Sequence, residues 1–264
     1  MTALNSETLR LGIDTGGTYT DAVLLAGDGS IVGAAKSLTT HHSLSHGIDA
    51  VLNQLPQDQL DRVSLVSVST TLATNAVVEG RGTPVCLLLA GYNAKQVNRA
   101  QLEQIVRGGF CELLSGGHTA GGSEQNPLDV VAAREIILAR QADVAAFGIS
   151  SVFGVRNPDH ELRLRDLVRL LTDKPVTCGH ELASQLDAPR RALTVAFNAS
   201  LIPYIDELIR SIELILRQRR IRAPLMMVKG DGSLISAKAD RTRPVATILS
   251  GPAASVIGAA QLNR

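Results

Sequence analysis

The run Asp14-Thr15-Gly16-Gly17-Thr18-Tyr19-Thr20-Asp21 combines residue types that suit the binding of a phosphate group. It follows one apolar, strand-like stretch and precedes another. Glycine leaves room for an oxyanion, so backbone N–H groups in such a turn can converge on one. Thr18 and Thr20 add hydroxyl donors, and Asp14 can hold a magnesium ion through water. A plain β-hairpin with a Gly-Gly turn is the alternative that these residues leave open.

Thr70, Thr71 and Asn75 form a second candidate site. Residues 63–69 alternate Val and Leu with Ser and predict a strand, and a helix is predicted to begin at Thr70-Thr71. Hydroxyls and helix N-terminal N–H groups then lie at one edge of a sheet, where they attract an anion. An ordinary N-cap by Thr70 or Thr71 is the alternative, and it uses the same residues.

His180 and Glu181 are adjacent and can act as a base or as a metal-binding pair, although an isolated histidine is more often structural. Cys178 lies two residues before His180, which suggests a nucleophile and base only if the two meet in space. Buried, structural side chains are the alternative for all three residues.

Other polar residues are weaker candidates. His118 lies in the glycine-rich segment 115–123, which we predict to be a flexible loop, and a ligand role there is open. His41 and His42, with His46, have the spacing of a weak metal cluster, but three histidines before a helix often lie in solvent. Asn198 lies in a predicted helix, where its amide can cap a loop or contact a substrate.

Composition excludes several classes of function. The chain has 264 residues, 45% of them apolar, and a formal net charge of +1, which gives no electrostatic case for nucleic acid or anionic lipid. Aromatic residues make up 3% and there is no Trp, so stacking on single-stranded nucleic acid is not expected. We find no apolar run long enough for a membrane helix and no secretory signal. Three widely spaced cysteines predict free thiols and a reducing cytoplasm.

Strands and helices are predicted to alternate along the chain, which indicates an α/β sheet covered on its faces. The predicted strands are residues 9–13, 20–25, 30–37, 63–69, 84–90, 144–150, 175–178, 224–228 and 234–235. The predicted helices are residues 43–55, a short one from 70, 129–141, 160–171 and a long one at 189–222 that contains Pro203. Residues 91–128 show no regular pattern.

Together, several of these stretches resemble the hydantoinase A/oxoprolinase family of the actin-like ATPase superfamily. They occur in the family's order and cover almost the whole chain. The matching stretches are Gly12 to Asp21, Ser69 to Ala76, Gly179 to Glu181, Asn198 to Pro203 and Leu249 to Ala254. Gly116-Gly117-His118 is similar to an element of the shorter members.

The resemblance implies an α/β fold of the ribonuclease-H-like, actin-like ATPase type, with a mixed sheet flanked by helices. In such proteins two domains close over ATP and magnesium. It further implies an N-terminal hydantoinase/oxoprolinase domain at residues 8–185, and at residues 186–264 the beginning of a second, incomplete domain. We find no second Asp-x-Gly-Gly-Thr loop, so we expect an N-terminal part of a longer protein that by itself binds ATP weakly and is inactive.

For the full-length protein the resemblance implies an ATP-dependent hydrolase that opens a lactam or hydantoin-type ring after phosphorylating its amide. Gly16, Gly17, Thr18 and Thr20 would form the phosphate cradle, Asp14 would hold the metal through water, and Gly251 would begin a connecting helix beside the nucleotide. The implied catalytic residues are Asp14, Thr70, Thr71, Asn75, His180 and Glu181. Asp21 is open between such a site and a structural role in the hairpin.

The implied partners are a small cyclic amide substrate and a second hydantoinase subunit, with no nucleic acid and no membrane. Two alternatives remain. The first is a small-molecule kinase of the same superfamily, which needs an additional acidic residue as base. The second is a non-catalytic, nucleotide-gated scaffold subunit whose domains signal by closure.

Overall fold

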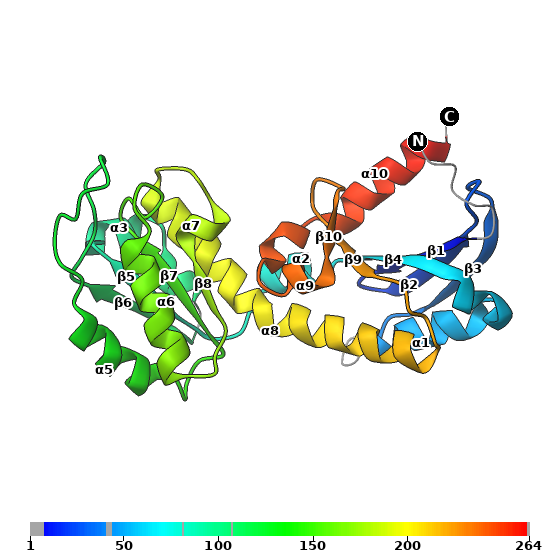
Figure 1. Ribbon diagram of the computed structural model, residues 1–264, viewed down its shortest axis with the longest axis horizontal. Coiled ribbons are helices and arrows are strands. Elements are labelled where there is room, and N and C mark those ends of the chain that lie inside the picture. The colour runs from blue at the N-terminus through cyan, green and yellow to red at the C-terminus, as the bar shows by residue number, and fades with distance from the viewer. Residues whose placement is uncertain (1–7, 41–43, 81, 107, 263–264) are drawn as a thin grey trace. The chain divides into compact units, whose positions relative to one another are not determined.

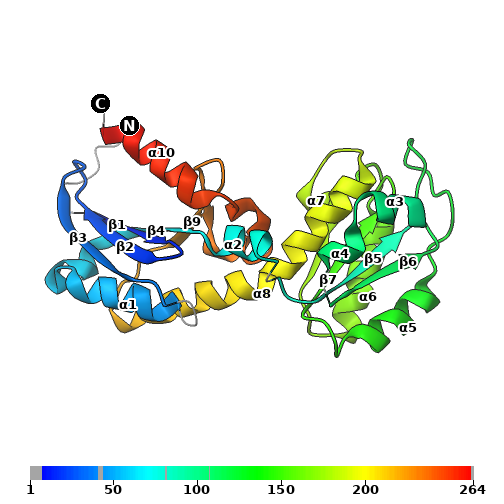
Figure 2. The same cartoon turned by 180° about the vertical axis from the view of Figure 1, so that it is seen from behind.

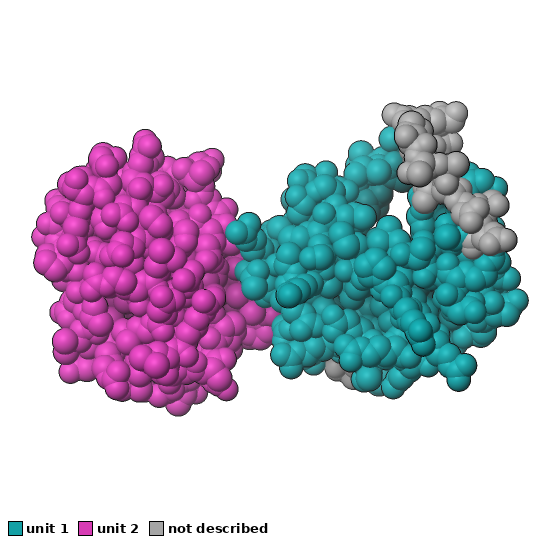
Figure 3. Space-filling view, viewed as in Figure 1, with its two compact units in different colours: residues 1–75, 204–264 teal, residues 76–203 magenta. Residues whose placement is uncertain are grey.

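The computed structural model describes residues 8–40, 44–80, 82–106 and 108–262 (Figure 1). The chain forms two compact units (Figure 3). Unit 1 comprises residues 1–75 and 204–264, and unit 2 comprises residues 76–203. Each unit contains its own β-sheet, so the chain leaves unit 1 after one set of strands and returns to complete the same sheet.

Among the described residues, unit 1 is built on a mixed sheet of six strands. In spatial order these are β10 (Leu234–Ser236), β9 (Leu225–Val228), β4 (Val63–Thr70), β1 (Leu9–Thr15), β2 (Tyr19–Leu25) and β3 (Ile31–Leu38). β1 pairs antiparallel with β2 and parallel with β4, and β9 is parallel to β4. The central strand β1 therefore ends beside both the hairpin to β2 and the end of β4.

Alternation along β1 decides which side chains face the core. Leu9, Leu11 and Ile13 are buried, whereas Gly12 and Asp14 lie on the other, half-exposed face. Helix α1 (Leu44–Gln54) packs against β1, β2 and β3. The helix predicted at 43–55 is confirmed, and its apolar residues Ile48, Val51 and Leu52 are buried, as is Leu55 directly after it.

Figures 1 and 2 show α1 and the C-terminal half of α8 (Ala188–Gln218) along one face of this sheet, and α10 (Ser250–Leu262) along the other. Short helices connect these elements. They are η1 (Gln57–Arg62), α2 (Leu72–Val78), α9 (Ala237–Asp240) and η2 (Pro244–Thr247). Helix α10 contacts β4 and β9, which places its N-terminus near the end of β4.

Within the described residues, unit 2 is a parallel sheet of four strands with helices on both faces. The order is β6 (Phe110–Leu114), β5 (Val85–Ala90), β7 (Ala146–Ser151) and β8 (Val176–Cys178). One face packs on α5 (Val130–Arg140) and α6 (Asp159–Leu171). The other packs on α3 (Ala94–Arg99), α4 (Leu102–Ile105) and the N-terminal half of α8. Every residue of β5 is buried, as its continuous apolar run predicts.

The prediction for residues 91–128 was incomplete, because this region contains α3, α4 and β6. These elements are short, and glycines at 108 and 109 precede β6. The repeating pattern of apolar residues that predicts a helix or a strand is therefore too short to detect here. The strands predicted at 224–228 and 234–235 are confirmed as the antiparallel pair β9 and β10, and Gly232 in the turn between them has a positive φ.

Helix α8 continues through Pro203, which is also the last residue of unit 2. Contrary to the expectation of no membrane-length apolar run, one 18-residue window of α8 reaches a mean hydropathy of 1.2. Of that window, 56% is buried inside the protein, and a core helix passes the same test of length and composition. The boundary expected between two family domains after residue 185 is not tested by the compact units, which are defined by contacts within the structure. That boundary stays a prediction.

Candidate functional site

Residues Gly16, Gly17 and Thr18 connect β1 to β2 in unit 1. Gly16 N–H donates to the Tyr19 carbonyl at 3.0 Å. Thr39 fixes the loop from outside, because its hydroxyl donates to the Gly16 carbonyl at 2.9 Å and its N–H donates to the Thr18 carbonyl at 2.9 Å. Within the described chain, the N–H groups of Gly17 and Thr18 have no acceptor. The loop thus offers two backbone donors at its tip.

Asp14 lies at the end of β1, opposite Asp21 on β2 and opposite Ser69 on β4. The Ser69 hydroxyl donates to Asp14 Oδ1 at 2.6 Å, so the carboxylate is held in one orientation. Asp21 instead forms an ion pair of 3.1 Å with Lys36 on β3. Of the two facing carboxylates, Asp14 is therefore the one without a cationic partner among the described residues.

The end of β4 lies beside this loop. Thr71 N–H donates to the Thr15 carbonyl at 3.1 Å, and the Asn75 side-chain amide donates to the Thr71 hydroxyl at 3.3 Å. A Cβ placed on Gly17 would be 3.6 Å from the Asn75 amide nitrogen. The structure therefore brings Thr71 and Asn75 to the hairpin tip. Thr70 is buried, and its hydroxyl accepts from Leu72 N–H at 3.0 Å, which fixes the turn that leads into α2.

The start of α10 is attached to the same corner. The buried Ser250 hydroxyl donates to the Thr70 carbonyl at 2.9 Å and accepts from Thr70 N–H at 3.2 Å. A Cβ on Gly251 would lie 3.4 Å from the Thr71 methyl group. Gly251 is thus next to Thr71, and the hairpin, the end of β4 and the start of α10 form one polar corner of unit 1.

The two hydroxyls predicted for the phosphate cradle have different environments, because Thr18 belongs to the loop before β2 and Thr20 to the strand itself. Thr18 is exposed at the tip of the loop. Thr20 is 0% exposed, and its hydroxyl is 3.1 Å from the Thr39 hydroxyl. Thr18 is therefore positioned to meet a ligand, whereas Thr20 helps to hold Thr39 beneath the loop.

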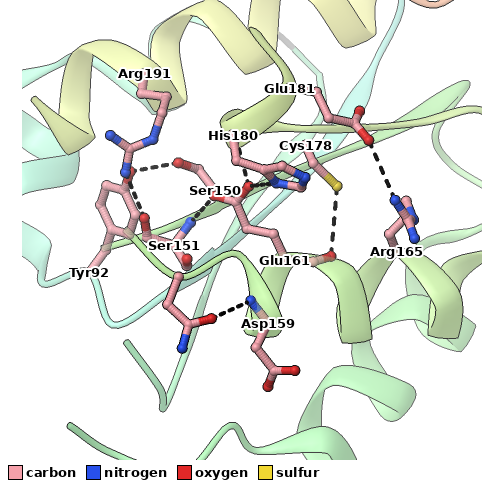
Figure 4. A network of polar contacts seen from close by, with 11 residues as sticks. Tyr92, Ser150, Ser151, Asp159, Glu161, Arg165, Cys178, His180, Glu181 and Arg191 are labelled. Atoms are coloured by element: carbon pink, nitrogen blue, oxygen red, sulfur yellow. Dashed lines mark hydrogen bonds and ion pairs between the residues drawn. The ribbon is translucent and has the colours of Figure 1, made fainter. Parts of the chain in front are cut away.

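His180 and Glu181 belong to unit 2 and follow β8 on the short helix α7 (Gly179–Leu182). Glu181 is 3.5 Å from Arg165, whereas His180 Nδ1 is 2.6 Å from the carboxylate of Glu161 (Figure 4). Cys178 lies close to both, but its thiol donates to the Glu161 carbonyl and burial raises its pKa. The thiol is therefore protonated at neutral pH and is not a ready nucleophile.

The segment containing His118 is folded rather than open. His118 is 1% exposed, and its ring centroid is 4.2 Å from that of His160. His160 Nδ1 accepts from Gly117 N–H at 3.0 Å, which holds the loop. Burial and the neighbouring His160 lower the pKa of His118, so this imidazole is neutral at pH 7. The prediction of a flexible loop at 115–123 is wrong around His118. Although this segment is neither helix nor strand, contacts of its residues with the buried His160 hold it in place.

The remaining polar candidates separate clearly. His46 is exposed on α1, and His41 and His42 lie outside the described residues. Asn198 is buried in α8 and its amide donates to the Thr177 hydroxyl at 3.1 Å, which is a structural contact. All three cysteines are free, and burial raises the pKa of Cys86 to about 12.

A pocket of about 380 Å³ lies in unit 2 at the carboxyl ends of β5, β6 and β7. No charged side chain lines it, and Ser115, Gln125 and Asn126 are its polar side chains besides Tyr92. Ligands of open α/β sheets bind at this edge. The pocket was not predicted, since it depends on the ends of three separate strands.

Sequence reasoning missed Ser69, Thr39 and Glu161. Ser69 immediately precedes the Thr70-Thr71 pair, so its place on the strand was a usable signal. Thr39 and Glu161 gave no such signal, because each meets its partner through pairing or packing of segments far apart in the chain.

Two family profiles match this chain over most of its length. The profile described as "Hydantoinase/oxoprolinase N-terminal region" matches residues 10–171, and "Hydantoinase/oxoprolinase" matches residues 191–264. The chain is 30% identical to the caprolactamase subunit alpha of Pseudomonas jessenii over 96% of its own length and 40% of that protein. It is 26% identical to the acetophenone carboxylase gamma subunit of Aromatoleum aromaticum, covering 98% of this chain and 39% of that one.

The crystal structure of the ATP-dependent caprolactamase from Pseudomonas jessenii superimposes with a TM-score of 0.76 at 29% identity. The match covers 92% of this chain and 39% of that chain. The predicted α/β fold, of the ribonuclease-H-like, actin-like ATPase type with a mixed sheet flanked by helices, is confirmed. The chain spans about two fifths of the length of these relatives, which are named as subunits.

Proposed function

Since this chain belongs to the hydantoinase/oxoprolinase family, we propose that it is part of an ATP-dependent enzyme that opens a lactam or hydantoin-type ring. ATP activates the amide by phosphorylating its carbonyl oxygen. The observation that carries the proposal is the polar corner of unit 1, where Asp14, the Gly16-Gly17-Thr18 loop and Thr71-Asn75 converge. A structural hairpin alone does not require an oriented carboxylate beside two unpaired N–H groups.

The donors of this corner fit a phosphate group and Mg²⁺. The carboxylate of Asp14 is a hard oxygen ligand, oriented by Ser69, and Mg²⁺ is commonly held by one or two carboxylates together with water and phosphate oxygens. The unpaired N–H groups of Gly17 and Thr18 fit phosphate oxygens. Bound Mg²⁺ would neutralise developing charge on the phosphate oxygens.

The residues of the chain then have distinct roles. Gly16, Gly17 and Thr18 form the cradle, and Thr20 supports it through Thr39. Asn75, whose amide nitrogen lies beside Gly17, orients the phosphate, and Thr71 holds that amide through its hydroxyl. Thr70, through Ser250, and Gly251, through its contact with Thr71, keep α10 against the cradle. Catalysis of phosphoryl transfer depends mainly on such positioning.

The cyclic amide substrate, Mg²⁺, a second hydantoinase subunit and a cytoplasmic location belong to this proposal. Relatives named as subunits and as ATP-dependent support the partner subunit and the use of ATP. A small-molecule kinase remains the alternative reaction, and a nucleotide-gated scaffold the non-catalytic one. Among the described residues, we find no feature that favours the kinase or the scaffold over the ring-opening enzyme.

The test is phosphate release by the complete gene product, with any copurifying subunit, on hydantoin, 5-oxoproline, ε-caprolactam, sugars and no substrate. We expect release that depends on a cyclic amide. Asp14→Asn should lower kcat about a hundredfold or more, because the metal-water ligand is lost. Asp21→Asn is the matched control, since it removes the facing carboxylate of the Lys36 pair and should change kcat less than about threefold.

Release confined to sugars would favour the kinase. Tight nucleotide binding without turnover on any compound would favour the scaffold. An Asp14→Asn variant as active as the Asp21→Asn control would remove the polar corner from the mechanism.

A further inference from the structure

The pocket of about 380 Å³ in unit 2 has no part in the function proposed above. It lies at the carboxyl ends of β5, β6 and β7, the edge where open α/β sheets bind their ligands. Its volume falls within the range of roughly 300–1,000 Å³ that is usual for small-molecule sites. Every residue that lines it belongs to unit 2, so the pocket is complete within one compact unit.

Three glycines shape the inner part of this pocket. Gly91, Gly116 and Gly117 line it, and all three have a positive φ that side chains rarely allow. A Cβ on Gly91 would be only 2.7 Å from the Gly116 carbonyl oxygen, and a Cβ on Gly116 would be 3.1 Å from Nδ1 of His160. The ends of β5 and β6 therefore approach closely, and backbone rather than side chains forms this part of the lining.

The lining is held in place by the rest of unit 2. Gly117 N–H donates to Nδ1 of the buried His160 at 3.0 Å, and the Gly117 carbonyl accepts from Gln125 N–H at 3.0 Å. On the opposite strand end, the Tyr92 hydroxyl donates to the Ala188 carbonyl at 2.6 Å. Since these contacts already fix the loops, a ligand would bind without the cost of ordering them.

Two backbone donors of the lining have no acceptor. Tyr92 and Gly116 are buried residues, and neither of their N–H groups donates a hydrogen bond within the described part of the chain. Buried N–H groups of folded proteins are nearly always paired with protein, water or a ligand. The acceptor for these two groups therefore comes from outside the chain.

The other lining residues indicate which ligand fits. Gln125 and Asn126 are exposed, and their amide side chains can both donate and accept hydrogen bonds. Leu113, Leu114 and Val152 add apolar surface. No charged side chain lines the pocket, so an ion would lose its hydration there without a charged partner. A carbonyl acceptor, an N–H donor and a short hydrocarbon part together match this lining.

We propose that this pocket binds a small uncharged carboxamide, at a site separate from the polar corner of unit 1. The ligand carbonyl accepts from the N–H groups of Tyr92 and Gly116, and its own N–H donates to the side chains of Gln125 and Asn126. Binding there involves unit 2 alone and no step of the ring-opening reaction, so the outcome does not depend on the function proposed above.

The test is a titration of the 264-residue chain with ε-caprolactam, 2-pyrrolidone and acetamide, followed by ¹H–¹⁵N NMR. We expect saturable shifts of the Tyr92 and Gly116 amides, with a Kd on the order of a millimolar for the tightest of these small ligands. Acetate and inorganic phosphate should leave both amides unshifted. The absence of saturable shifts with all three amides would overturn the proposal, and so would tighter binding of either anion.

A double variant tests the side-chain contacts. Gln125→Ala with Asn126→Ala should weaken binding of the tightest amide about tenfold or more, because two hydrogen-bonding groups are lost. Asn98→Ala is the matched control, since it removes an exposed amide from α3 of the same unit that does not line the pocket. Equal affinities of the double variant and the control would overturn the assignment of Gln125 and Asn126.

Discussion

Identical residue types acquire different roles through their partners. Asp14 and Asp21 face each other in the register of β1 and β2, yet Ser69 orients the first and Lys36 neutralises the second. A hydroxyl leaves the charge of a carboxylate available, whereas an ammonium group largely cancels it. At the residue scale, therefore, the neighbours of a carboxylate decide whether it can serve a metal and phosphate site.

Asp240 at the end of α9 is a carboxylate whose surroundings affect the stability of the fold. It is 0% exposed, and neither carboxylate oxygen has a hydrogen-bond partner among the described residues. Burial raises the pKa of Asp240 from 3.8 to about 7. The folded state therefore keeps a proton that the unfolded state loses at lower pH, so stability falls between about pH 4 and pH 7.

We expect the free energy of unfolding of Asp240→Asn to increase relative to that of the wild type as the pH rises through this range. The expected increase is about 1.4 kcal/mol for each pH unit. Urea unfolding of both proteins between pH 4 and pH 8 measures the difference. Asp231→Asn is the control, because hydrogen bonds from Ser233 lower the pKa of Asp231 to about 2 and its contribution is constant over this range. A constant difference for Asp240→Asn as well would contradict the prediction.

At the scale of elements, the glycines of the β1–β2 hairpin are needed because they leave room beside the loop, and not because the backbone there adopts a conformation that favours glycine. Neither Gly16 nor Gly17 has a positive φ, unlike the turn glycines Gly29 and Gly232. A side chain at position 17 is thus allowed by the backbone, and its Cβ would meet Asn75 at an ordinary distance of 3.6 Å. The glycine matters for what approaches the loop from outside.

Gly17→Ala should therefore fold with a free energy of unfolding within about 0.5 kcal/mol of the wild type, while weakening nucleotide binding at least about tenfold. Chemical unfolding and calorimetry on the complete gene product measure the two effects. Gly258→Ala in α10 is the control, because its Cβ has no atom within 4 Å. Large destabilisation by Gly17→Ala, or unchanged binding, would contradict the role of the loop.

The junction between β4 and α10 depends on one buried hydroxyl. Ser250 bonds both backbone groups of Thr70, although 180 residues separate the two in the chain. Ser250→Ala should cost about 1–3 kcal/mol, because it leaves a buried N–H group of Thr70 without its partner. Thermal unfolding measures this cost, and faster amide exchange at Thr70 should accompany it. Unchanged exchange would show that another contact holds this junction.

At the scale of the whole molecule, the chain builds unit 1 from two separated segments and unit 2 from the continuous segment between them. Unit 2 has its own parallel sheet with apolar clusters on both faces. Continuity of the chain and a complete core are the conditions for independent folding.

Residues 76–203 expressed alone should therefore fold and unfold cooperatively, with a mixed α/β circular dichroism spectrum and a single thermal transition. Residues 1–75 alone should not fold, because β9, β10 and α10 of the same unit would be missing. An unfolded 76–203 segment would show that unit 2 depends on the rest of the chain.

Local patterns were sufficient to predict most of the elements. The alternation in β1, the apolar face of α1 and the continuous apolar run of β5 each reflect one physical requirement, the burial of a defined face. The hairpin at Asp14–Asp21 was equally readable, because Gly-Gly between two apolar runs specifies a turn. The short helices α3 and α4 were missed, since fewer than two helical turns carry little signal, and β6 was missed because buried and exposed residues do not alternate along it.

The sequence alone determined the chemistry that is present: a carboxylate, glycines and hydroxyls in one hairpin, and motifs in a family's order. Only the tertiary structure decided the partners. It oriented Asp14 with Ser69, turned Thr20 inward, and joined His180 to Glu161 rather than to Glu181. The physical reason is that residue types and local periods are encoded over a few positions, whereas strand register and helix packing bring together side chains from distant segments.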